Sequence, residues 1–265
     1  MGETLRRYWI PALMIEELPY PDCPPVRVKL LGEELIAFRD TTGKIGLVDE
    51  YCPHRKVSLF YGRNEECGLR CAYHGWKFDT AGNCVDLPSE PPESNFKQNI
   101  KIKSYPCEER GGVIWTYMGK PEDKPSCLSR SGCWFPIVSG IFRKKIQQCN
   151  YFQALEGGID SSHVSILHSG SVGGLGVSSK SKSTSLLSQD AAPRFEVVDT
   201  DYGLLIGARR TADDDHFYWR ITQFIMPWYT MIPPFGGAPR GGHAGCPLMM
   251  KIVGCGAGVG RRGVI

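Results

Sequence analysis

Residues 52–59 read CPHRKVSL, and residues 68–84 read GLRCAYHGWKFDTAGNC. Each stretch contains one closely spaced pair of metal-binding side chains, Cys52 with His54 and Cys71 with His74, and sixteen residues separate the two pairs. Each pair is short enough to lie on one loop, and two loops from neighbouring hairpins can hold a small inorganic group between them. These four residues are therefore the first candidates for a functional site.

Two kinds of site use this combination of thiolate and imidazole ligands. In a [2Fe–2S] cluster, thiolates suit the iron that stays ferric, and imidazoles on the other iron remove negative charge and raise the reduction potential. The same ligand types form structural zinc sites with two cysteines and two histidines. Ligand type and spacing leave both alternatives open. Colour distinguishes them, since a cluster protein is red-brown and a zinc protein is colourless.

The surrounding residues favour the cluster. Both stretches resemble the cluster-binding segments of Rieske proteins, in particular those of aromatic-ring-hydroxylating oxygenases, which run C-P-H-R and C-x-Y-H-G-W-x-F-x-x-x-G. The resemblance covers about residues 5–118, including RRYWIP at residues 6–11. It is strongest to the oxygenase (alpha) subunits of the branch that acts on phthalates, phenoxybenzoates or vanillate-like ethers. One departure is Lys56-Val57, where family members often carry small residues such as Gly-Ala.

The resemblance implies a terminal oxygenase component. A separate NAD(P)H-dependent reductase would deliver electrons to a [2Fe–2S] cluster on Cys52, His54, Cys71 and His74, and mononuclear Fe(II) would use O₂ to hydroxylate or O-demethylate an aromatic substrate. A homotrimer is expected for a full-length chain. The alternative is a Rieske ferredoxin-like electron carrier, which needs only residues up to about 118 and leaves the remainder without a purpose.

The first part of the chain has the pattern of an all-β domain. Val26, Val28 and Leu30 alternate with charged residues, which is the period of a half-buried strand. Lys44 to Val48 and Gly112 to Tyr117 are further short strands, and Asp79-Thr80-Ala81-Gly82-Asn83 reads as a hairpin turn. The sequence therefore predicts a Rieske domain over residues 1–118, built as a small antiparallel sandwich with two cluster-binding hairpin loops.

The second part has a mixed pattern. Residues 119–135 are rich in Gly, Pro and Ser and are interpreted as a linker. Asn150 to His168 is predicted to be helical, because its apolar residues recur at helix spacing, and residues 169–189 are predicted to be a mobile loop. Strand patterns then return, so residues 136–244 are predicted to be a partial α+β catalytic domain with an antiparallel sheet. The strand patterns cover Phe195–Val198, Gly203–Ala208 and Phe217–Ile225.

A polar stripe follows the predicted helix. Asn150, Gln153, Glu156, Asp160 and His163 are spaced by three, three, four and three residues, and His168 follows. Spacing alone favours a solvated helix face.

The stripe resembles the mononuclear-iron helix of the same oxygenase family, which implies that His163 and His168 bind Fe(II). Asp160 matches the family's bridging aspartate, which hydrogen-bonds a histidine of the iron and a cluster histidine of the neighbouring subunit, and it is the predicted catalytic residue. Two histidines five residues apart require a bend or helix end near Ser165.

The third iron ligand expected from the resemblance is a carboxylate from a late helix. The last acidic residue of this chain is Asp215, and Asp213–Asp215 precede a strand pattern and read as a turn. The sequence is therefore expected to lack the third ligand and to bind this iron weakly, with poor turnover.

The last residues, 245–265, are expected to be the product of a frameshift. They show no strand or helix period, and they follow a segment that still resembles the family. Met249-Met250-Lys251 must be encoded by ATG ATG AAR, and the same bases read one position earlier force Asp-Glu, as the family pattern requires. A base lost near codon 245 would explain this tail. Sequencing of the gene tests it, because the other frame should continue for a hundred or more codons.

Composition limits the class of protein. The chain has 265 residues, a net charge of +3 and no apolar run near the roughly 18 residues of a membrane-spanning helix, so neither a nucleic acid nor a membrane is an expected partner. Eleven cysteines, an odd number without a secretory signal, argue against a disulfide framework. A cytoplasmic protein is expected.

Overall fold

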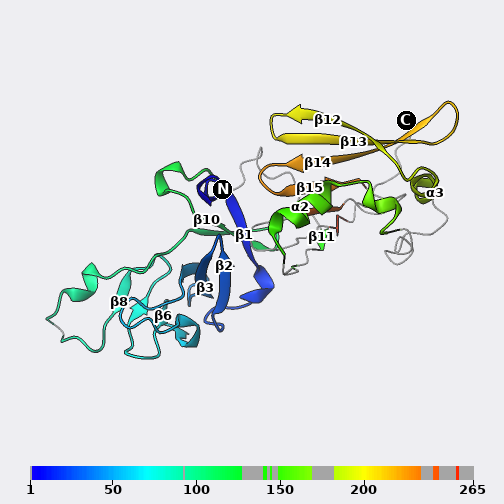
Figure 1. The fold of residues 1–265 in the computed structure, drawn as a ribbon. Coiled ribbons are helices and arrows are strands. Elements are labelled where there is room, and N and C mark those ends of the chain that lie inside the picture. The colour runs from blue at the N-terminus through cyan, green and yellow to red at the C-terminus, as the bar shows by residue number, and fades with distance from the viewer. Residues whose placement is uncertain are drawn as a thin grey trace, which may run out of the picture. The chain divides into compact units, whose positions relative to one another are not determined.

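The computed structural model of the chain describes residues 2–91, 93–126, 140–141, 144, 149–168, 182–233, 241–244 and 255–256. Contacts divide the chain into two compact units, Met1–Phe135 and Pro136–Ile265 (Figure 1). The domain limits expected from the sequence, at residues 118, 135 and 244, stay predictions.

The described part of the first unit is built from short antiparallel strands, as predicted. Three sheets have the orders β1-β10-β9, β2-β3-β4 and β5-β6-β7-β8. The strands are β1 (Trp9–Met14), β2 (Val26–Leu30), β3 (Glu33–Arg39), β4 (Ile45–Asp49), β5 (Arg63–Glu65), β6 (Gly68–Arg70), β7 (Lys77–Phe78), β8 (Cys84–Asp86), β9 (Cys107–Arg110) and β10 (Val113–Tyr117). The helical segments are α1 (Gly2–Arg6), η1 (Ile15–Glu17), η2 (Leu59–Tyr61), η3 (Phe96–Asn99) and η4 (Pro121–Asp123).

The hairpin between β7 and β8 turns where the sequence predicts it. Gly82 has a φ of +79°, and a Cβ atom there would lie 2.2 Å from the carbonyl oxygen of Ile102. The Asp79 carboxylate accepts hydrogen bonds from the amides of Ala81 and Asn83. Glycine is therefore required at this turn both for its backbone conformation and for space.

The two Cys–His loops have the same backbone hydrogen-bond pattern. In the first loop, the Cys52 carbonyl accepts from the Lys56 amide (2.9 Å) and the Cys52 amide donates to the carbonyl of Val57 (2.9 Å). In the second, the Cys71 carbonyl accepts from the Gly75 amide (3.1 Å) and the Cys71 amide donates to the carbonyl of Trp76 (2.8 Å). Each loop is thus closed on its own cysteine.

The fourth residue after each cysteine has left-handed backbone. Gly75 has a φ of +77° and Lys56 a φ of +57°. This conformation costs a residue with a Cβ atom about 1 kcal/mol or more and costs glycine almost nothing. The departure at Lys56 therefore places a side chain at the one loop position whose geometry favours glycine.

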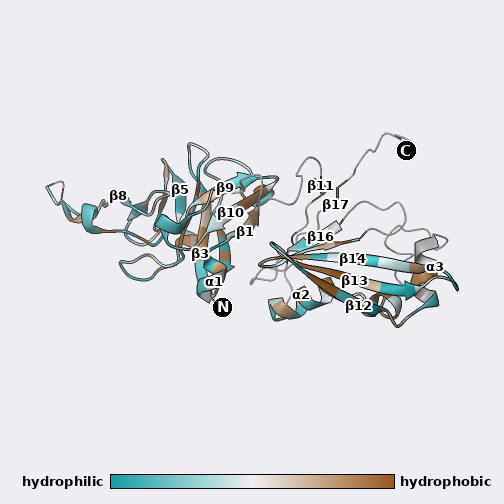
Figure 2. Cartoon of the chain, turned by 90° about the horizontal axis from the view of Figure 1, so that it is seen from above, coloured by the Kyte–Doolittle hydropathy of each residue, from teal (hydrophilic) through white to brown (hydrophobic). Residues whose placement is uncertain are grey.

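The second unit contains a five-stranded antiparallel sheet of order β12-β13-β14-β15-β16, with hydrophobic residues along much of β12 and β13 (Figure 2). The three predicted strand segments are confirmed as β12, β13 and β14. Helix α2 packs against β14 and β15, and α3 packs against β13. The bounds are β11 (Gly140–Ile141), α2 (Tyr151–Ile159), η5 (His163–Ser165), α3 (Lys182–Gln189), β12 (Arg194–Thr200), β13 (Gly203–Thr211), β14 (Phe217–Ile225), β15 (Tyr229–Ile232), β16 (Gly241–Ala244) and β17 (Cys255–Gly256).

The helix predicted over Asn150 to His168 is shorter than expected. Asn150 caps α2, because its side chain accepts a hydrogen bond from the Phe152 amide, but the helix ends at Ile159. Asp160 is extended, with ψ of 131°, and its carboxylate accepts from the amides of Ser162 (2.7 Å) and His163 (3.1 Å). A side chain that bonds the following backbone amides competes with the helix, and this competition ends it.

The loop predicted over residues 169–189 is wrong in its last part, because Lys182–Gln189 forms α3. Leu187 is buried there, and the Gln189 side chain donates to the carbonyl of Ala212. Burial of one apolar side chain against β13 therefore overrides a composition rich in serine. Residues 169–181 lie outside the described residues.

The tail expected at 245–265 lies outside the described residues except for β17, which pairs with β11. In the described part of the chain, no helix is long and apolar enough to span a membrane.

The left-handed position in the first loop makes a stability prediction. Lys56→Ile places a β-branched residue at positive φ and should lower the free energy of unfolding of the first unit by about 1–2 kcal/mol. Lys56→Gly should stay within about 0.5 kcal/mol of the parent chain, because relief of the strain offsets the greater entropy of unfolded glycine.

Differential scanning calorimetry of the first unit's transition measures both changes. Arg55→Ile is the matched control, because Arg55 is exposed and does not have positive φ, and it should change stability by about 0.5 kcal/mol or less. Equal stability of Lys56→Ile and Lys56→Gly would contradict the strain assigned to this position.

Candidate metal centres

The two candidate cysteines lie inside the core of the first unit. Cys52 follows β4 and Cys71 follows β6, and their side chains are 2% and 3% exposed. Both belong to a buried apolar group that includes Phe38, Leu69 and Phe78. The Cys71 thiol is close enough to Cys52 to raise the pKa of the Cys52 thiol. The two loops therefore place both sulfur atoms together in an apolar environment.

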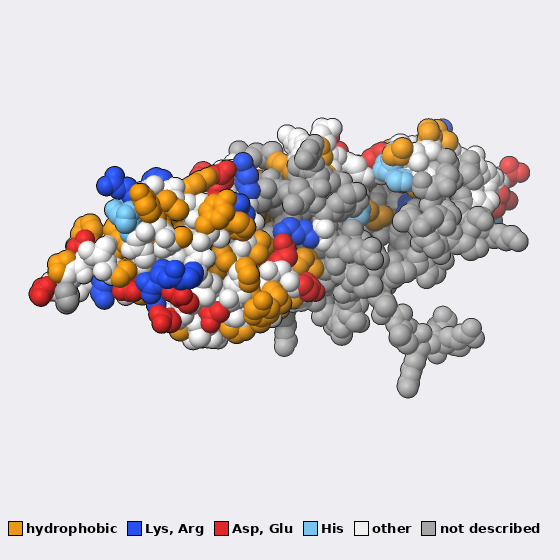
Figure 3. Space-filling model, turned by 90° about the horizontal axis from the view of Figure 1, so that it is seen from below, with side chains coloured by type: hydrophobic (Ala, Val, Ile, Leu, Met, Phe, Trp, Pro, Cys, Tyr) orange, Lys and Arg blue, Asp and Glu red, His pale blue; other side chains and the backbone are white. Residues whose placement is uncertain are grey.

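The two candidate histidines form a second pair. The ring centroids of His54 and His74 are 4.6 Å apart, and the His54 ring stacks on Trp76 at 4.5 Å with an interplanar angle of 4°. Both rings are half-buried. Figure 3 shows histidine at the surface of the first unit beside Lys and Arg side chains, and that unit contains no other histidines. The candidate sulfur ligands are therefore inside, and the candidate imidazole ligands are at the rim.

One ring nitrogen has an environment that fits a metal bond. The Nδ1 atom of His74 is buried and has no hydrogen-bond partner among the described residues. A buried polar atom without a partner is costly unless another group satisfies it. An iron atom bound between the two histidine rings would do so.

The environment of the loops also controls protonation. Burial, together with the adjacent Cys71 thiol, raises the pKa of the Cys52 thiol to about 11, although hydrogen bonds from the backbone oppose the shift. Burial, the neighbouring His74 and the charge of Arg55 lower the pKa of His54. His54 is thus held in the neutral form that can donate a lone pair.

The four side chains lie as two pairs, cysteine with cysteine and histidine with histidine. In the described residues, no three potential ligands surround a single point. A [2Fe–2S] cluster has this ligand arrangement, since each of its two irons takes only two protein ligands. The residues therefore fit the cluster.

The second loop has a support that the sequence did not indicate. Arg70, at the end of β6, donates from Nη1 to the carbonyl oxygen of Gly75 (2.8 Å) and to Asp86 (2.7 Å), and from Nε to Glu65 (2.6 Å). Its side chain is mostly buried. Arg70 therefore ties the carbonyl of the left-handed residue to two carboxylates of the same sheet, one on β5 and one on β8.

The second unit brings together the predicted iron ligands and Asp160. The ring centroids of His163 and His168 are 5.1 Å apart, and Nδ1 of His163 lies 2.7 Å from Oδ2 of Asp160. His163 begins the short helix η5, and His168 follows it in a turn. The predicted helical stripe is wrong for Asp160 and His163, which lie beyond the end of α2.

The Asp160 carboxylate stays charged in this turn. Burial opposes its charge, but hydrogen bonds from the Ser162 amide and from His163 outweigh burial and lower the pKa of Asp160. A carboxylate at the Nδ1 side of an imidazole favours the tautomer with a proton on Nδ1, which leaves the lone pair of His163 Nε2 available for a metal.

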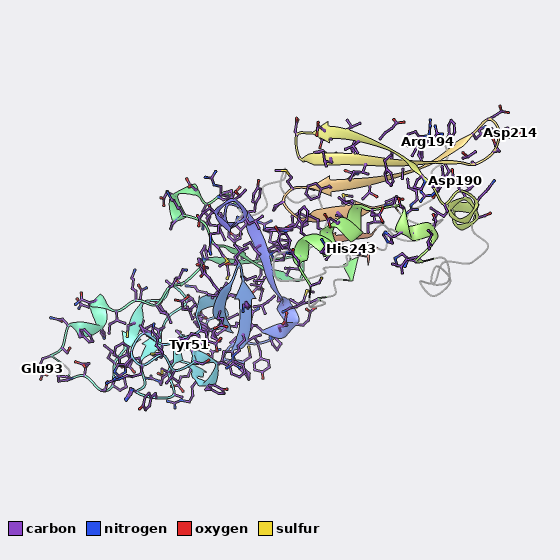
Figure 4. The ribbon with its side chains drawn as sticks, in the orientation of Figure 1. Tyr51, Glu93, Asp190, Arg194, Asp214 and His243 are labelled. Atoms are coloured by element: carbon purple, nitrogen blue, oxygen red, sulfur yellow. The ribbon has the colours of Figure 1, made fainter. Side chains whose placement is uncertain are left out.

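The acidic run Asp213–Asp215 forms the turn between β13 and β14, as predicted, and Asp214 is labelled there in Figure 4. Its neighbour His216 is 76% exposed and bonds Asp213.

Sequence reasoning missed Arg210, the fully buried arginine of β13. Leu204, Ile206 and Ala208 precede it at alternate positions, so the strand period, which places Arg210 on their face, could have singled it out.

Comparison with known proteins gives two family matches. A family model described as "Rieske [2Fe-2S] domain" matches residues 8–106. A second, described as "LigXa C-terminal domain like", matches residues 116–237. The first includes all four candidate cluster residues, and the second includes His163, His168 and Asp160.

Curated relatives match along most of the chain. It is 45% identical to the phthalate 4,5-dioxygenase oxygenase subunit of Pseudomonas putida, over 88% of this chain and 55% of the relative. It is 42% identical to the 3-chlorobenzoate-3,4-dioxygenase oxygenase subunit of Comamonas testosteroni (88% and 53%) and 34% identical to the phenoxybenzoate dioxygenase subunit alpha of Ectopseudomonas oleovorans (91% and 60%). The chain thus spans about half the length of the curated relatives it matches.

A solved structure shows the same fold. Dicamba monooxygenase bound to dicamba has a TM-score of 0.69 and 21% identity, over 94% of this chain and 76% of that one. Three findings point to the same family. They are the Rieske fold of the first unit, the sheet and helix of the second unit, and the relatives at 34–45% identity. The chain belongs to the family of Rieske-type oxygenase subunits.

Proposed function

We propose that this chain is the terminal oxygenase component of a multicomponent oxygenase that acts on an aromatic substrate. A [2Fe–2S] cluster is held in the first unit, and Fe(II) is bound in the second beside the catalytic Asp160. The proposed ligands are Cys52, His54, Cys71 and His74 for the cluster, and His163 and His168 for Fe(II).

One observation carries the proposal: two loops with the same backbone hydrogen-bond pattern, each with one cysteine and one histidine, bring the two cysteines together and the two histidines together. Cys52 and Cys71 are together in the core, and His54 and His74 are together at the rim. A zinc ion would take all four around one centre. Two pairs of different chemistry suit two irons of different charge.

The cluster, when bound, supplies one-electron transfer at a potential that its two imidazole ligands raise. The chain's own residues keep the sulfur side dry and the imidazole side accessible to a redox partner. In the second unit, Asp160 orients the ring of His163 and fixes its tautomer. His163 and His168 supply two neutral ligands, which leave positions open for O₂ and substrate.

The partners follow from the relatives. Their names describe oxygenase subunits, so electrons come from another component, which we propose is an NAD(P)H-dependent reductase. The names of the relatives specify dioxygenases of phthalate, 3-chlorobenzoate and phenoxybenzoate, which supports an aromatic substrate. We propose that the reaction is hydroxylation or O-demethylation of that substrate. We further propose a cytoplasmic homotrimer in the full-length protein, with a Rieske domain at 1–118, a linker at 119–135 and oxygenase-domain sequence at 136–244.

The cluster assignment is tested by Cys52→Ser. Loss of one thiolate should remove the visible absorption and the EPR signal of the reduced protein, and bound iron should fall from about two atoms per chain toward none. Cys84→Ser is the matched control, because Cys84 lies in the same buried group but has no histidine at ligand spacing. The assignment fails if Cys52→Ser keeps the signal or if Cys84→Ser removes it to the same extent.

The role of Asp160 is tested by Asp160→Asn. The amide has one acceptor oxygen, whereas Asp160 uses both oxygens, so the His163 ring should lose its orientation. Co(II) affinity of the second centre, followed by EPR with the cluster oxidised, should fall about 10- to 100-fold. The control is Glu156→Gln on α2, a carboxylate that bonds the Gln153 side chain instead. Equal Co(II) affinities for the two variants would refute the role.

A further inference from the structure

Arg210 is a fully buried cation in the second unit. It lies on β13 with a relative exposure of 0%, on the face that also carries Ile206 and Ala208. Burial lowers the pKa of Arg210, as does the charge of Arg220, while the Asp190, Tyr218 and Asp160 charges act in the other direction. A buried charge is expensive unless hydrogen bonds satisfy it. The acceptors of the Arg210 hydrogen bonds therefore show which part of the structure the buried guanidinium supports.

Within the described residues, the hydrogen bonds of this guanidinium go to two segments outside the sheet. Nη2 donates to the carbonyl oxygen of Ser161 (2.7 Å) and to Oγ of Ser165 (3.2 Å), and Nη1 donates to Oγ of Ser161 (3.4 Å). Nε donates to the carbonyl oxygen of Asp190 (3.0 Å), the residue that follows α3 and is labelled in Figure 4. One side chain thus fixes both ends of the turn Ser161–Ser165 to the sheet.

That turn contains His163 and follows directly on Asp160. Ser161, which is 4% exposed, is the residue that takes two of the bonds. Helix α2 has already ended at Ile159, so its hydrogen bonds no longer hold this backbone, and the bonds of the short helix η5 join residues of the turn only to one another and to the residues that follow. Within the turn, the Ser162 and His163 amides bond Asp160, but these bonds set only its local shape. The bonds of Arg210 join the turn to β13 of the sheet, and helix α3 also contacts η5.

We propose that Arg210 is the positioning residue of the iron centre, which clamps the Ser161–Ser165 turn to β13 and so holds His163 and Asp160 in place to bind the metal. The inference rests on the proposed iron centre. Arginine suits this role because its planar fork presents several donors in fixed directions, whereas the ammonium of lysine is a single point charge. Arg210 donates to carbonyl and hydroxyl oxygens and not to the Asp160 carboxylate, so that carboxylate can bond His163.

The test uses the full chain with Arg210→Lys and Arg210→Met. The probe is Co(II), added to the second centre and followed by its EPR signal with the cluster oxidised. Loss of a charged hydrogen bond to a buried carbonyl should weaken Co(II) binding about tenfold or more and alter the line shape. Amide exchange over residues 160–165, measured by mass spectrometry without added metal, should accelerate by a similar factor.

Matched controls are Arg209→Lys and Arg209→Met. Arg209 is the adjacent residue on the opposite face of β13, where its guanidinium lies 4.4 Å from the Phe217 ring centroid. These variants should leave both Co(II) binding and the exchange of the turn unchanged. If Arg210→Lys matches the parent chain in both measurements, or if the Arg209 variants lose Co(II) to the same extent, the inference is overturned.

A milder variant covers the case in which the Arg210 variants unfold the second unit. Ser161→Ala with Ser165→Ala removes two acceptor hydroxyls and leaves the carbonyl bond, so Co(II) binding should weaken about two- to tenfold. Parent-like binding and exchange would overturn the clamp. If the parent chain itself binds no Co(II), the iron centre of the proposed function fails, and the exchange of the turn in the Arg210 variants still decides whether the clamp exists.

Discussion

The first unit depends on one backbone constraint, the closing of each Cys–His loop on its own cysteine. The carbonyl and amide of Cys52 bond the fourth and fifth residues after it, and those of Cys71 do the same. This closure needs left-handed backbone at Lys56 and Gly75. It turns each cysteine into the core and its histidine toward the rim. The unequal environment of the two ligand types thus follows from a repeated turn rather than from the sheet around it.

In the second unit, a side chain and not the backbone shapes the site, because it ends a helix. The Asp160 carboxylate takes amides that would otherwise continue α2, and the same carboxylate bonds the ring of His163. Ending the helix is also what allows His163 and His168 to approach, since five residues on a straight helix separate them by about 140°. One carboxylate therefore shapes the backbone and orients the ligand, while buried Arg210 holds the result against the sheet.

Much of this could be predicted from the sequence where one period or one motif governs the structure. Alternation predicted the strand Val26–Leu30, a strand pattern predicted Phe217–Ile225, and Gly82 predicted the turn. The spacing of Cys and His selected the four side chains that the structure brings together as a cysteine pair and a histidine pair, and their role as ligands stays a prediction. The helix over Asn150 to His168 was overextended, because apolar periodicity does not register a side chain that competes for backbone amides. Helix α3 and the bonds of Arg70 and Arg210 depend on contacts between distant segments, which local patterns do not contain.

The central claim is that two imidazoles and two thiolates bind different irons of one cluster. Pulsed EPR of the reduced chain, labelled with ¹⁵N only in histidine, tests it most directly, because the added electron resides on the imidazole-bound iron and the coupled spin of the two irons reaches its nitrogen ligands. The account predicts two strongly coupled ¹⁵N nuclei, one of which disappears when His54 is replaced and the other when His74 is replaced. A reduced chain with no coupled histidine nitrogen, or with no EPR signal at all, would contradict it.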